Sequence, residues 1–339
     1  MQSLVLLWHH GSTMAMDVSF LVPAYNAEAT IVFALRSILA QDARGVGWEV
    51  IVIDDGSTDS TRELVRDFMG RNPSARIELL EEKHRGEAAA LNRGLNRVSG
   101  DYVALVESDV VLASDWLRLC LGALQENGVA GAGGYLRDAR GAPWIARLAA
   151  IEVEAKLADQ PHYAAHISSA NALYHSWAFE RVGRFREGLY NATFDSDFNA
   201  RLLKSGCRLR FVREAQATHA YKRSLAAYLI RFYWYGRFRP HVRQGFLYPA
   251  DRWVALLVVL TAVAYASLGL ISWSPWVTAA AWASSLGFNA LWTLRLALLH
   301  PDRALWCYPL ILLLRNSVAL VGILVGLLPW RTGSHEDLS

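Results

Sequence analysis

Two acidic side chains, Glu107 and Asp109, follow the apolar run in the segment DYVALVESD. They are two residues apart, so an extended chain directs both to the same side. Carboxylate oxygens are good ligands for Mg²⁺ and Mn²⁺, and such a cation neutralises the charge of a departing diphosphate. The pair therefore predicts a divalent metal site. The alternative is that both acids cap the following helix.

A second acidic pair, Asp54 and Asp55, ends the apolar run EVIVIDD and is followed by Gly56. Carboxylates at the end of a strand accept hydrogen bonds from a base N–H group and from ribose hydroxyls, and the ring of Tyr25 offers a stacking face. These residues are compatible with a nucleotide site. Taken alone, an acidic turn with a capping aspartate explains them as well.

The elements that carry these acids alternate between strand-like and helix-like segments from residue 17 to about residue 111. This alternation predicts an α/β fold with a mostly parallel sheet, and strands that are apolar throughout indicate helices on both faces. Ligands of such sheets bind beyond the carboxyl ends of the strands, where the acidic turns fall. The expected strands are VSFLVPAY, EVIVIDD, RIELLEE and DYVALVESD, with helices over 29–39, after Thr58 and from Gly86.

The segments VSFLVPAYNAEATI and EVIVIDDGSTDST resemble the opening of the glycosyltransferase family 2 catalytic domain. The resemblance continues to about residue 240. It implies a GT-A-like nucleotide-sugar-binding domain over 17–220, an inverting, metal-dependent transferase, and a nucleoside diphosphate sugar as donor, with UDP-sugar favoured.

The same resemblance implies which side chains contact the donor. Pro23, Tyr25 and Asp55 match positions that line the base and ribose, and Asn92 in HRGEAAALNRG matches a helix beside the nucleotide. Small residues on that helix equally indicate close helix packing. Arg85 is a candidate contact for the diphosphate, although a solvated surface charge is the simpler interpretation.

Metal and sugar contacts follow in the same way. The family carries Asp-x-Asp where this chain has Glu107 and Asp109, so the shorter Asp109 is expected to be the more direct ligand. His219 corresponds to a family histidine that completes the metal or diphosphate site, with simple packing as the alternative. Ser169 and Asn171 are candidate hydrogen-bond partners of the donor sugar, and a loop-stabilising role is the equal alternative.

The segment YNATFDSDFNARLLKSGCRL resembles the Glu-Asp element of the family, with Phe194 where Glu is usual. Aligning Arg201 with the family's helix arginine makes Asp195 the catalytic base, which would deprotonate an acceptor hydroxyl. Asp197, two residues on, is the rival candidate for the base, but its spacing to Arg201 favours capping the helix or orienting that arginine. The alternative is that both acids only cap the helix.

Downstream of the catalytic domain, the chain turns basic, aromatic and then apolar. The basic and aromatic segment 221–252 is predicted to lie at a membrane interface. Three transmembrane helices are expected at roughly 253–272, 276–299 and 306–328, within 253–330, because each apolar run approaches the ~20 residues that cross a hydrocarbon core. Tryptophans near the predicted ends support these boundaries.

Orientation of the predicted integral membrane protein follows from its Lys and Arg residues. The basic segment precedes the first span, whereas the turn at Ser274 and Pro275 is uncharged, so the catalytic domain is predicted to be cytoplasmic. The tail 331–339 then falls on the opposite side, which places Arg331 away from the basic segment. Arg315, with Asn316, is a candidate contact for an acceptor-lipid phosphate, against snorkelling or helix pairing.

Composition excludes several other classes of function. A net charge of +3 is too small and too evenly spread for a nucleic-acid surface, and three distant cysteines indicate neither a disulfide framework nor a zinc site. Residues 1–16 form an N-terminal extension whose apolar run is too short for a signal peptide. The sequence does not determine the oligomeric state.

The sequence thus predicts sugar transfer, with Mn²⁺ or Mg²⁺, from a nucleotide-sugar to a hydroxyl of a membrane-associated acceptor. The acceptor would be a lipid-linked glycan, a glycolipid or an envelope saccharide. One alternative is a polyprenyl-phosphate glycosyltransferase, whose acceptor is already ionised and needs no base. The other is a catalytically silent membrane scaffold that binds nucleotide-sugars.

Overall fold

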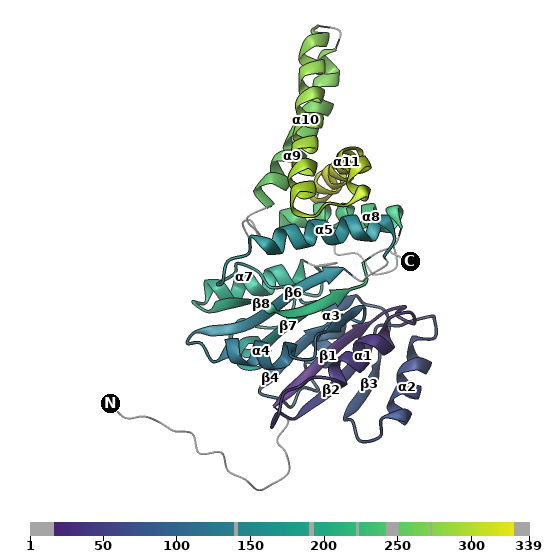
Figure 1. Ribbon diagram of the computed structural model, residues 1–339, viewed down its shortest axis with the longest axis vertical. Helices are drawn as coiled ribbons and strands as arrows, with labels where there is room; N and C mark the ends of the chain where they lie inside the picture. The colour runs from purple at the N-terminus through teal and green to yellow at the C-terminus, as the bar shows by residue number, and fades with distance from the viewer. Residues whose placement is uncertain are drawn as a thin grey trace, which may run out of the picture.

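The computed structural model describes residues 17–138, 142–189, 193–221, 224–241, 251–271 and 273–328. The predicted N-terminal extension 1–16 and tail 331–339 lie outside the described residues, as does 242–250 of the interfacial segment. An α/β domain forms one end of the molecule, a long helical hairpin forms the other, and a layer of helices lies between them (Figure 1).

One mixed sheet organises the α/β domain, with the strand order β3-β2-β1-β4-β7-β6-β8-β5. The first half, β3-β2-β1-β4, is parallel as predicted, and antiparallel ladders join β7 to β4 and to β6, and β5 to β8. The strands are β1 Val18–Ala24, β2 Trp48–Asp54, β3 Ile77–Glu81, β4 Tyr102–Val106, β5 Val110–Leu112, β6 Val129–Asp138, β7 Asn171–His175 and β8 Arg208–His219.

Helices cover both faces of this sheet, and its strands β1, β2 and β4 are mostly buried, as expected for such a layered core, whereas the edge strand β3 is only partly buried. Gly94 shows how close the layers lie, since a Cβ there would sit 2.9 Å from Cδ1 of Ile53. The small residues of this helix therefore serve close packing, as the sequence indicated. The helices of the domain are α1 Ile31–Leu39, α2 Thr61–Arg71, α3 Glu87–Gly94, α4 Trp116–Leu124, α6 Trp177–Val182 and α7 Phe194–Lys204.

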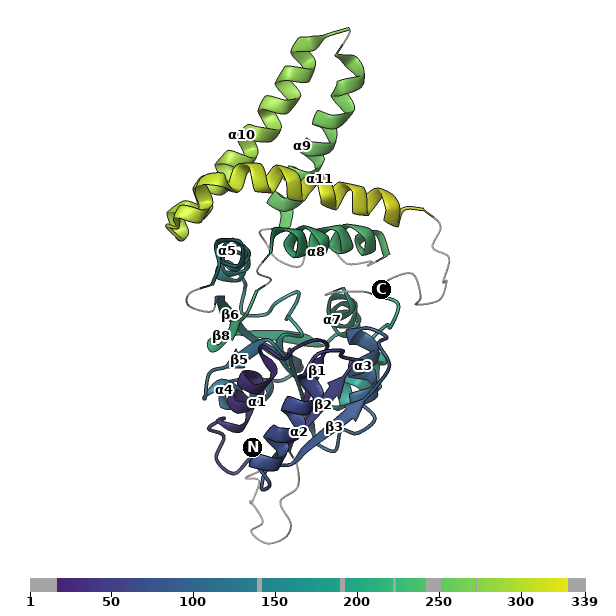
Figure 2. The ribbon, with the colours of Figure 1, turned by 90° about the vertical axis from the view of Figure 1, so that its right-hand side faces the viewer.

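Three helices, α5 Trp144–Ala158, α8 Leu225–Phe238 and α11 Tyr308–Gly326, form the intermediate layer. Figure 2 shows α8 and α11 along their lengths, one above the other, with α5 seen end-on. Helices α9 Asp251–Ser267 and α10 Pro275–Leu299 rise from this layer as an antiparallel hairpin. Short 3-10 turns at Arg239–His241, Leu268–Leu270 and Arg303–Cys307 join these helices.

Helix α5 is tied to the C-terminal helices by a row of ion pairs. The exposed pair of Asp159 with Arg295 has a separation of 2.6 Å, whereas the pair of Glu152 with Arg315 is buried. Two further pairs join Arg147 to Asp302 at 3.1 Å and Lys156 to Asp251 at 3.3 Å. Helix α5 and the C-terminal helices therefore share an interface that combines charge-matched ion pairs with a buried apolar cluster.

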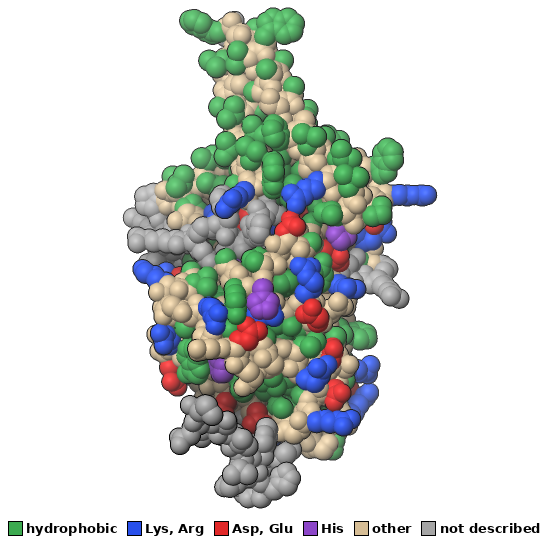
Figure 3. Space-filling model, turned by 60° about the vertical axis from the view of Figure 1, so that its left-hand side comes forward, with side chains coloured by type: hydrophobic (Ala, Val, Ile, Leu, Met, Phe, Trp, Pro, Cys, Tyr) green, Lys and Arg blue, Asp and Glu red, His purple; other side chains and the backbone are tan. Residues whose placement is uncertain are grey.

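Two helical segments, Asp251–Leu270 and Arg303–Gly326, are long and apolar enough to cross a membrane by length and composition. Helix α10, expected as the middle span, is helical but is not one of the two. Apolar side chains cover much of the hairpin surface (Figure 3). Helix α11 lies across the hairpin in Figure 2, instead of standing beside it as three parallel spans would.

Candidate active site

The predicted metal ligands come together where three strands end. Glu107 follows β4, Asp109 precedes β5, and His219 is the last residue of β8, paired in register with Val110 of β5. The Nε2 atom of His219 lies 3.2 Å from Oδ1 of Asp109 and 3.6 Å from Oε2 of Glu107. One ligand atom from each of the three lies within 4.8 Å of the others, so the residues form one compact cluster.

Burial and mutual repulsion shape the electrostatics of this cluster. Burial raises the pKa of Glu107, and the neighbouring Asp109 carboxylate raises it further. Burial opposes protonation of His219, but Asp109 and Glu107 outweigh it and raise the pKa of the imidazole. Two carboxylates and an imidazole are a donor set that fits Mn²⁺ or Mg²⁺. A divalent cation would relieve the repulsion that these shifts express.

The cluster opens into a cavity of about 480 Å³ that also contains the predicted nucleotide end. Five carboxylates and two guanidinium groups line the cavity. This excess of negative charge favours binding of a cation together with any anionic ligand. The lining residues are Pro23, Ala24, Tyr25, Asp55, His84, Arg85, Gly86, Glu87, Ala88, Glu107, Ser108, Asp109, Glu187, Leu189, His219, Ala227, Ile230, Arg231, Trp234 and Tyr235.

Asp55 organises the end of the cavity where a nucleotide is predicted to bind. Its carboxylate accepts hydrogen bonds from the backbone N–H groups of Arg85, at 2.8 Å, and Gly86, at 2.9 Å. The ring of His84 stacks on that of Tyr25, with centroids 4.1 Å apart. The loop before α3 is thereby held against the end of β2, and Tyr25 and Arg85 face the same hollow.

Two of the predicted nucleotide contacts, Asp54 and Asn92, do not line the cavity. Asp54 is fully buried, and its Oδ2 atom accepts a hydrogen bond from Nε of Arg62 at 2.7 Å. Asn92 exchanges hydrogen bonds with the backbone of Phe185, donating to its carbonyl at 2.9 Å and accepting from its N–H at 3.1 Å. Both side chains hold loops that border the cavity.

The predicted sugar contacts and base lie behind the cavity, and the described lining includes none of them. Asp195 is 2% exposed at the start of α7, and its Oδ2 atom accepts a hydrogen bond from the N–H of Ser169 at 3.3 Å. Nε2 of His166, a residue that the sequence did not single out, lies 3.6 Å from the same oxygen. Asn171 is fully buried at the start of β7.

Asp197 and Arg201 form the ion pair expected from their spacing, with Nε of Arg201 2.8 Å from Oδ2 of Asp197. The guanidinium group also donates to the carbonyl oxygens of Val182, Gly183 and, at 2.8 Å, Arg184. Arg201 therefore fixes the loop that leads to Phe185 and Glu187, and Asp197 orients Arg201.

Helix α8 supplies a wall of the cavity that the sequence did not predict. Arg231, Trp234 and Tyr235 face the cavity, and Nε of Arg231 donates to the hydroxyl of Tyr235 at 2.5 Å. The lining residues 227, 230, 231 and 234 follow the spacing of one helical face. That periodicity is visible in the sequence, but on its own it equally fits the membrane-interfacial helix predicted for this segment.

Glu87, the first residue of α3, is a second feature that the sequence did not single out. Burial raises its pKa well above the usual range, and the carboxylates of Glu107, Asp195 and Asp109 add to the shift. Its Oε1 atom is buried and has no hydrogen-bond partner among the described residues. Glu87 therefore extends the acidic character of the cluster of Glu107, Asp109 and His219 toward Asp195.

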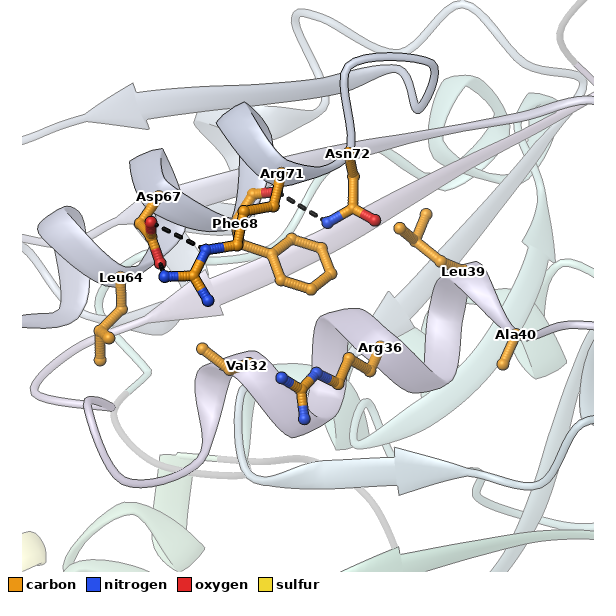
Figure 4. A pocket seen from close by; sticks show the side chains of 9 residues that line it. All are labelled: Val32, Arg36, Leu39, Ala40, Leu64, Asp67, Phe68, Arg71 and Asn72. Carbon is orange, nitrogen blue, oxygen red and sulfur yellow. Dashed lines mark hydrogen bonds and ion pairs between the residues drawn. The ribbon is translucent and has the colours of Figure 1, made fainter.

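A separate hollow lies between α1 and α2, on a different part of the domain (Figure 4). Arg71 and Asp67 form an ion pair at 2.9 Å along its rim. None of the predicted site residues lines it. Its lining residues are Val32, Arg36, Leu39, Ala40, Leu64, Asp67, Phe68, Arg71 and Asn72.

Several curated proteins are similar to this chain in sequence. A pre-mycofactocin glycosyltransferase of Mycobacterium tuberculosis is 31% identical over 228 residues, which are 65% of this chain and 46% of that protein. The succinoglycan biosynthesis protein ExoO of Rhizobium meliloti is 41% identical over 103 residues, 30% of this chain and 28% of that protein. The chain thus spans less than half the length of either relative.

A third relative carries its chemistry in its name. The UDP-Glc:alpha-D-GlcNAc-diphosphoundecaprenol beta-1,3-glucosyltransferase WfgD of Escherichia coli is 34% identical over 113 residues, 33% of this chain and 42% of that protein. All three relatives match only part of their own length, so their whole activities do not transfer directly to this chain.

A solved structure shares the fold. Mannosyltransferase PcManGT from Pyrobaculum calidifontis, in complex with GDP-Man and Mn²⁺, aligns with a TM-score of 0.61 at 22% identity, covering 91% of this chain and 87% of that one. GalNAc-T7 with UDP, GalNAc and Mn²⁺ aligns with a TM-score of 0.50 at 13% identity, over 70% of this chain and 53% of that one. The α/β domain therefore has the GT-A fold.

The glycosyl transferase family 2 model matches residues 19–200, more than half of the 339 residues. The match includes the strand ends that carry Asp55, Glu107 and Asp109. On this evidence the chain is a glycosyltransferase and belongs to glycosyltransferase family 2.

Proposed function

We propose that this chain transfers a sugar from a nucleoside diphosphate sugar, a UDP-sugar, to a hydroxyl of a membrane-associated acceptor, with inversion at the anomeric carbon. The observation that carries the proposal is the shared cavity, in which the nucleotide end at Tyr25 and Asp55 and the cluster at Asp109 face one hollow. A nucleotide bound at one end directs its diphosphate toward the acidic cluster at the other.

The donor half of the mechanism follows from the residues that line this cavity. Tyr25 offers a ring face to the base, and Asp55 has lone pairs beyond those used by the loop N–H groups to accept ribose hydroxyls. Arg85 is placed to meet the diphosphate, although its guanidinium also pairs with Glu187 at 2.7 Å. These three side chains would bind and orient the donor.

Asp109, Glu107 and His219 would hold the divalent cation, Mn²⁺ or Mg²⁺. When bound, the cation supplies charge neutralisation to the departing nucleoside diphosphate. Support comes from the donor set itself and from PcManGT and GalNAc-T7, whose structures contain Mn²⁺. Arg231, facing the same cluster from α8, adds a second positive group near the leaving phosphates.

The acceptor side is proposed to be membrane-associated. Apolar helix α11 packs against α8, which itself lines the cavity, and α9 packs against α11, so a lipid-borne acceptor would approach from the side that these helices occupy. WfgD, by its name, acts on a diphosphoundecaprenol-linked sugar, which supports an acceptor of this class. The catalytic domain is proposed to be cytoplasmic, where nucleotide-sugars are made.

Asp195 is proposed as the general base that takes the proton of the acceptor hydroxyl. Its burial behind the cavity also favours a second candidate, a polyprenyl-phosphate acceptor, which attacks through an ionised oxygen and needs no base. Ser169 and Asn171 are proposed to shape the sugar side of the site, with Ser169 acting through its hydrogen bond to Asp195.

The test is a transfer assay on the purified full chain in detergent or nanodiscs. A panel of nucleotide-sugars is incubated with native membrane lipids, with Mn²⁺ or with a chelator, and products are identified by mass spectrometry. We expect a glycosylated lipid that forms only when metal is present. The transferred sugar should have the inverted configuration at its anomeric carbon. Metal-independent transfer, retained configuration or the absence of any lipid product would contradict it.

A further inference from the structure

Both ends of α11 lie next to the catalytic side of the molecule. Before its first turn, Asp302 pairs with Arg147 of α5 at 3.1 Å. At its last turn, a Cβ on Gly326 would lie 2.1 Å from the carbonyl oxygen of Arg237, at the end of α8. A helix that crossed a membrane away from this domain would leave one of its ends on the far side, so these contacts indicate a different orientation.

The middle of α11 is also packed against this side. A Cβ on Gly322 would lie 2.2 Å from the carbonyl oxygen of Tyr233, so the backbones of α8 and α11 are in close contact. Arg315 pairs with Glu152 of α5 and is 1% exposed, and the amide of Asn316 donates to Asn289 of α10 at 3.3 Å. The predicted contact of Arg315 with a lipid phosphate is therefore replaced by a buried protein ion pair.

The opposite face of α11 is apolar and exposed. The polar side chains Arg315, Asn316 and Ser317 of α11 are hydrogen-bonded within the protein, so this face brings no unpaired charge into contact with hydrocarbon. The hairpin α9–α10 meets α11 at a steep angle (Figure 2). Helix α10 is not one of the two segments that are apolar enough by composition, and its last turns pack against α5 through Arg295 and Asp159. Its 25 residues nevertheless reach about 37 Å, against a hydrocarbon core of roughly 30 Å. The exposed residues of the α11 face are Leu310, Leu314, Val321 and Leu324.

We propose that α11 lies in the plane of the membrane, with this apolar face in the hydrocarbon of the leaflet nearest the catalytic domain. Only the hairpin α9–α10 crosses the bilayer, so the chain crosses twice and its C-terminal end returns to the catalytic side. The proposal rests on the membrane association proposed above. Charge distribution supports it, because Arg331 then lies on the same side as the basic segment before α9.

An in-plane α11 also has a consequence for the active site. Helix α8 lies between α11 and the cavity, with its Arg231 face toward the cavity and its Gly236 face toward α11. Lipid contact on α11 would therefore stabilise α8 on the side that faces away from the cavity. The active site would sit directly under the membrane surface, within reach of a lipid-linked acceptor.

Single cysteines test the number of crossings. In a Cys307→Ser background, in which Cys120 and Cys207 remain buried, Ser74→Cys reports the catalytic domain, Ser274→Cys the hairpin turn and Ser334→Cys the tail. Sealed vesicles of both orientations are treated with a membrane-impermeant maleimide. We expect Ser334→Cys to be labelled from the same side as Ser74→Cys, and labelling together with Ser274→Cys would overturn the proposal.

The same vesicles separate failure of this inference from failure of membrane association. If alkaline carbonate releases the protein, or if all three cysteines react from one side, the membrane part of the proposed function fails. If the protein stays in the membrane and Ser274→Cys is on the far side, only the position of Ser334→Cys decides the inference.

A depth measurement tests the lipid contact itself. Spin labels at Leu314→Cys and Leu324→Cys lie ten residues apart, about 15 Å along the helix axis. An in-plane helix gives both labels the same accessibility to oxygen dissolved in the lipid, whereas a crossing helix gives depths that differ by most of that length. If both labels are shielded from oxygen, a second copy of the chain covers the face and the proposed lipid contact is wrong.

Discussion

The cavity has two walls that acquire their positions in different ways. One wall consists of strand ends, where Asp55, Asp109 and His219 follow or precede strands of a single sheet and are placed by its register. The other wall is helix α8, with Arg231 and Trp234, which is held by contacts with α5 and α11. The local sequence determines where the side chains of the first wall lie, whereas the position of α8 depends on residues far away in the chain.

This difference separates the expected consequences of substitution. Changes at the strand ends should alter binding or transfer while the fold remains intact. Changes behind α8 should destabilise the assembly of the catalytic domain with the C-terminal helices, and activity should fall as a consequence.

Removing the charge of Glu152 should have the largest effect on stability. In Glu152→Gln, Arg315 remains buried without its countercharge, which typically costs about 3 to 5 kcal/mol. Denaturant unfolding of the detergent-solubilised protein, followed by tryptophan fluorescence, measures the loss. The double variant Glu152→Gln/Arg315→Met should recover much of it, because no unpaired charge remains. Wild-type stability in the single variant would show that the ion pair does not hold the α8 wall.

Asp195→Asn should affect transfer and leave donor binding intact. If Asp195 is the base, transfer to a hydroxyl acceptor falls by at least ~10²-fold, while the affinity for UDP with Mn²⁺ is unchanged. Steady-state transfer and calorimetry on the same preparation separate the two effects. Asp197→Asn serves as the control, because it should weaken the Arg201 clamp without removing a base. A fully active Asp195→Asn would instead point to Asp197 as the base or to a phosphate acceptor that needs none.

Gly322→Ala tests the contact behind α8. The added methyl group would lie 2.2 Å from the carbonyl oxygen of Tyr233, so the helices must separate, at a cost of about 1 to 3 kcal/mol. Thermal unfolding and transfer activity should both fall. Gly287→Ala on α10 is the matched control, since its Cβ would meet nothing within 4 Å. Equal behaviour of the two variants would contradict the close packing of α8 and α11.

The exposed ion pair on the same interface should contribute least. Arg295 and Asp159 are 2.6 Å apart but solvent-accessible, so Arg295→Met should change the free energy of unfolding by less than about 1 kcal/mol. The measurement is the same unfolding experiment used for Glu152→Gln. A loss as large as that of the buried pair would mean that burial is not what distinguishes them.

The strand-end wall was largely predictable because local sequence carries it. Apolar runs that end in acids identified β2 and β4, and the resemblance identified His219, which β-sheet register then brings to Asp109. What the sequence did not resolve is the direction of individual side chains. Adjacent residues of a strand point to opposite faces, so Asp55 lines the cavity while Asp54 pairs with Arg62.

The α8 wall and the orientation of α11 were not predictable in the same way. The aromatic and basic residues of α8 match an interfacial helix, and only tertiary contact shows that Arg231 faces the cavity. Hydropathy gave the position of α11 along the chain but not its direction. That direction depends on Gly322 against Tyr233 and on Arg315 against Glu152, contacts between residues up to 163 positions apart.

We expect Asp109, at the strand ends, to hold the metal that binds the nucleoside diphosphate. Isothermal titration calorimetry of UDP, with Mn²⁺ and with chelator, measures this binding on the wild type and on Asp109→Asn. Asp67→Asn is the control, because Asp67 lines only the separate hollow between α1 and α2. We expect Mn²⁺-dependent UDP binding in the wild type and in the control, and its loss in Asp109→Asn. Unchanged affinity in Asp109→Asn would show that the metal is held elsewhere.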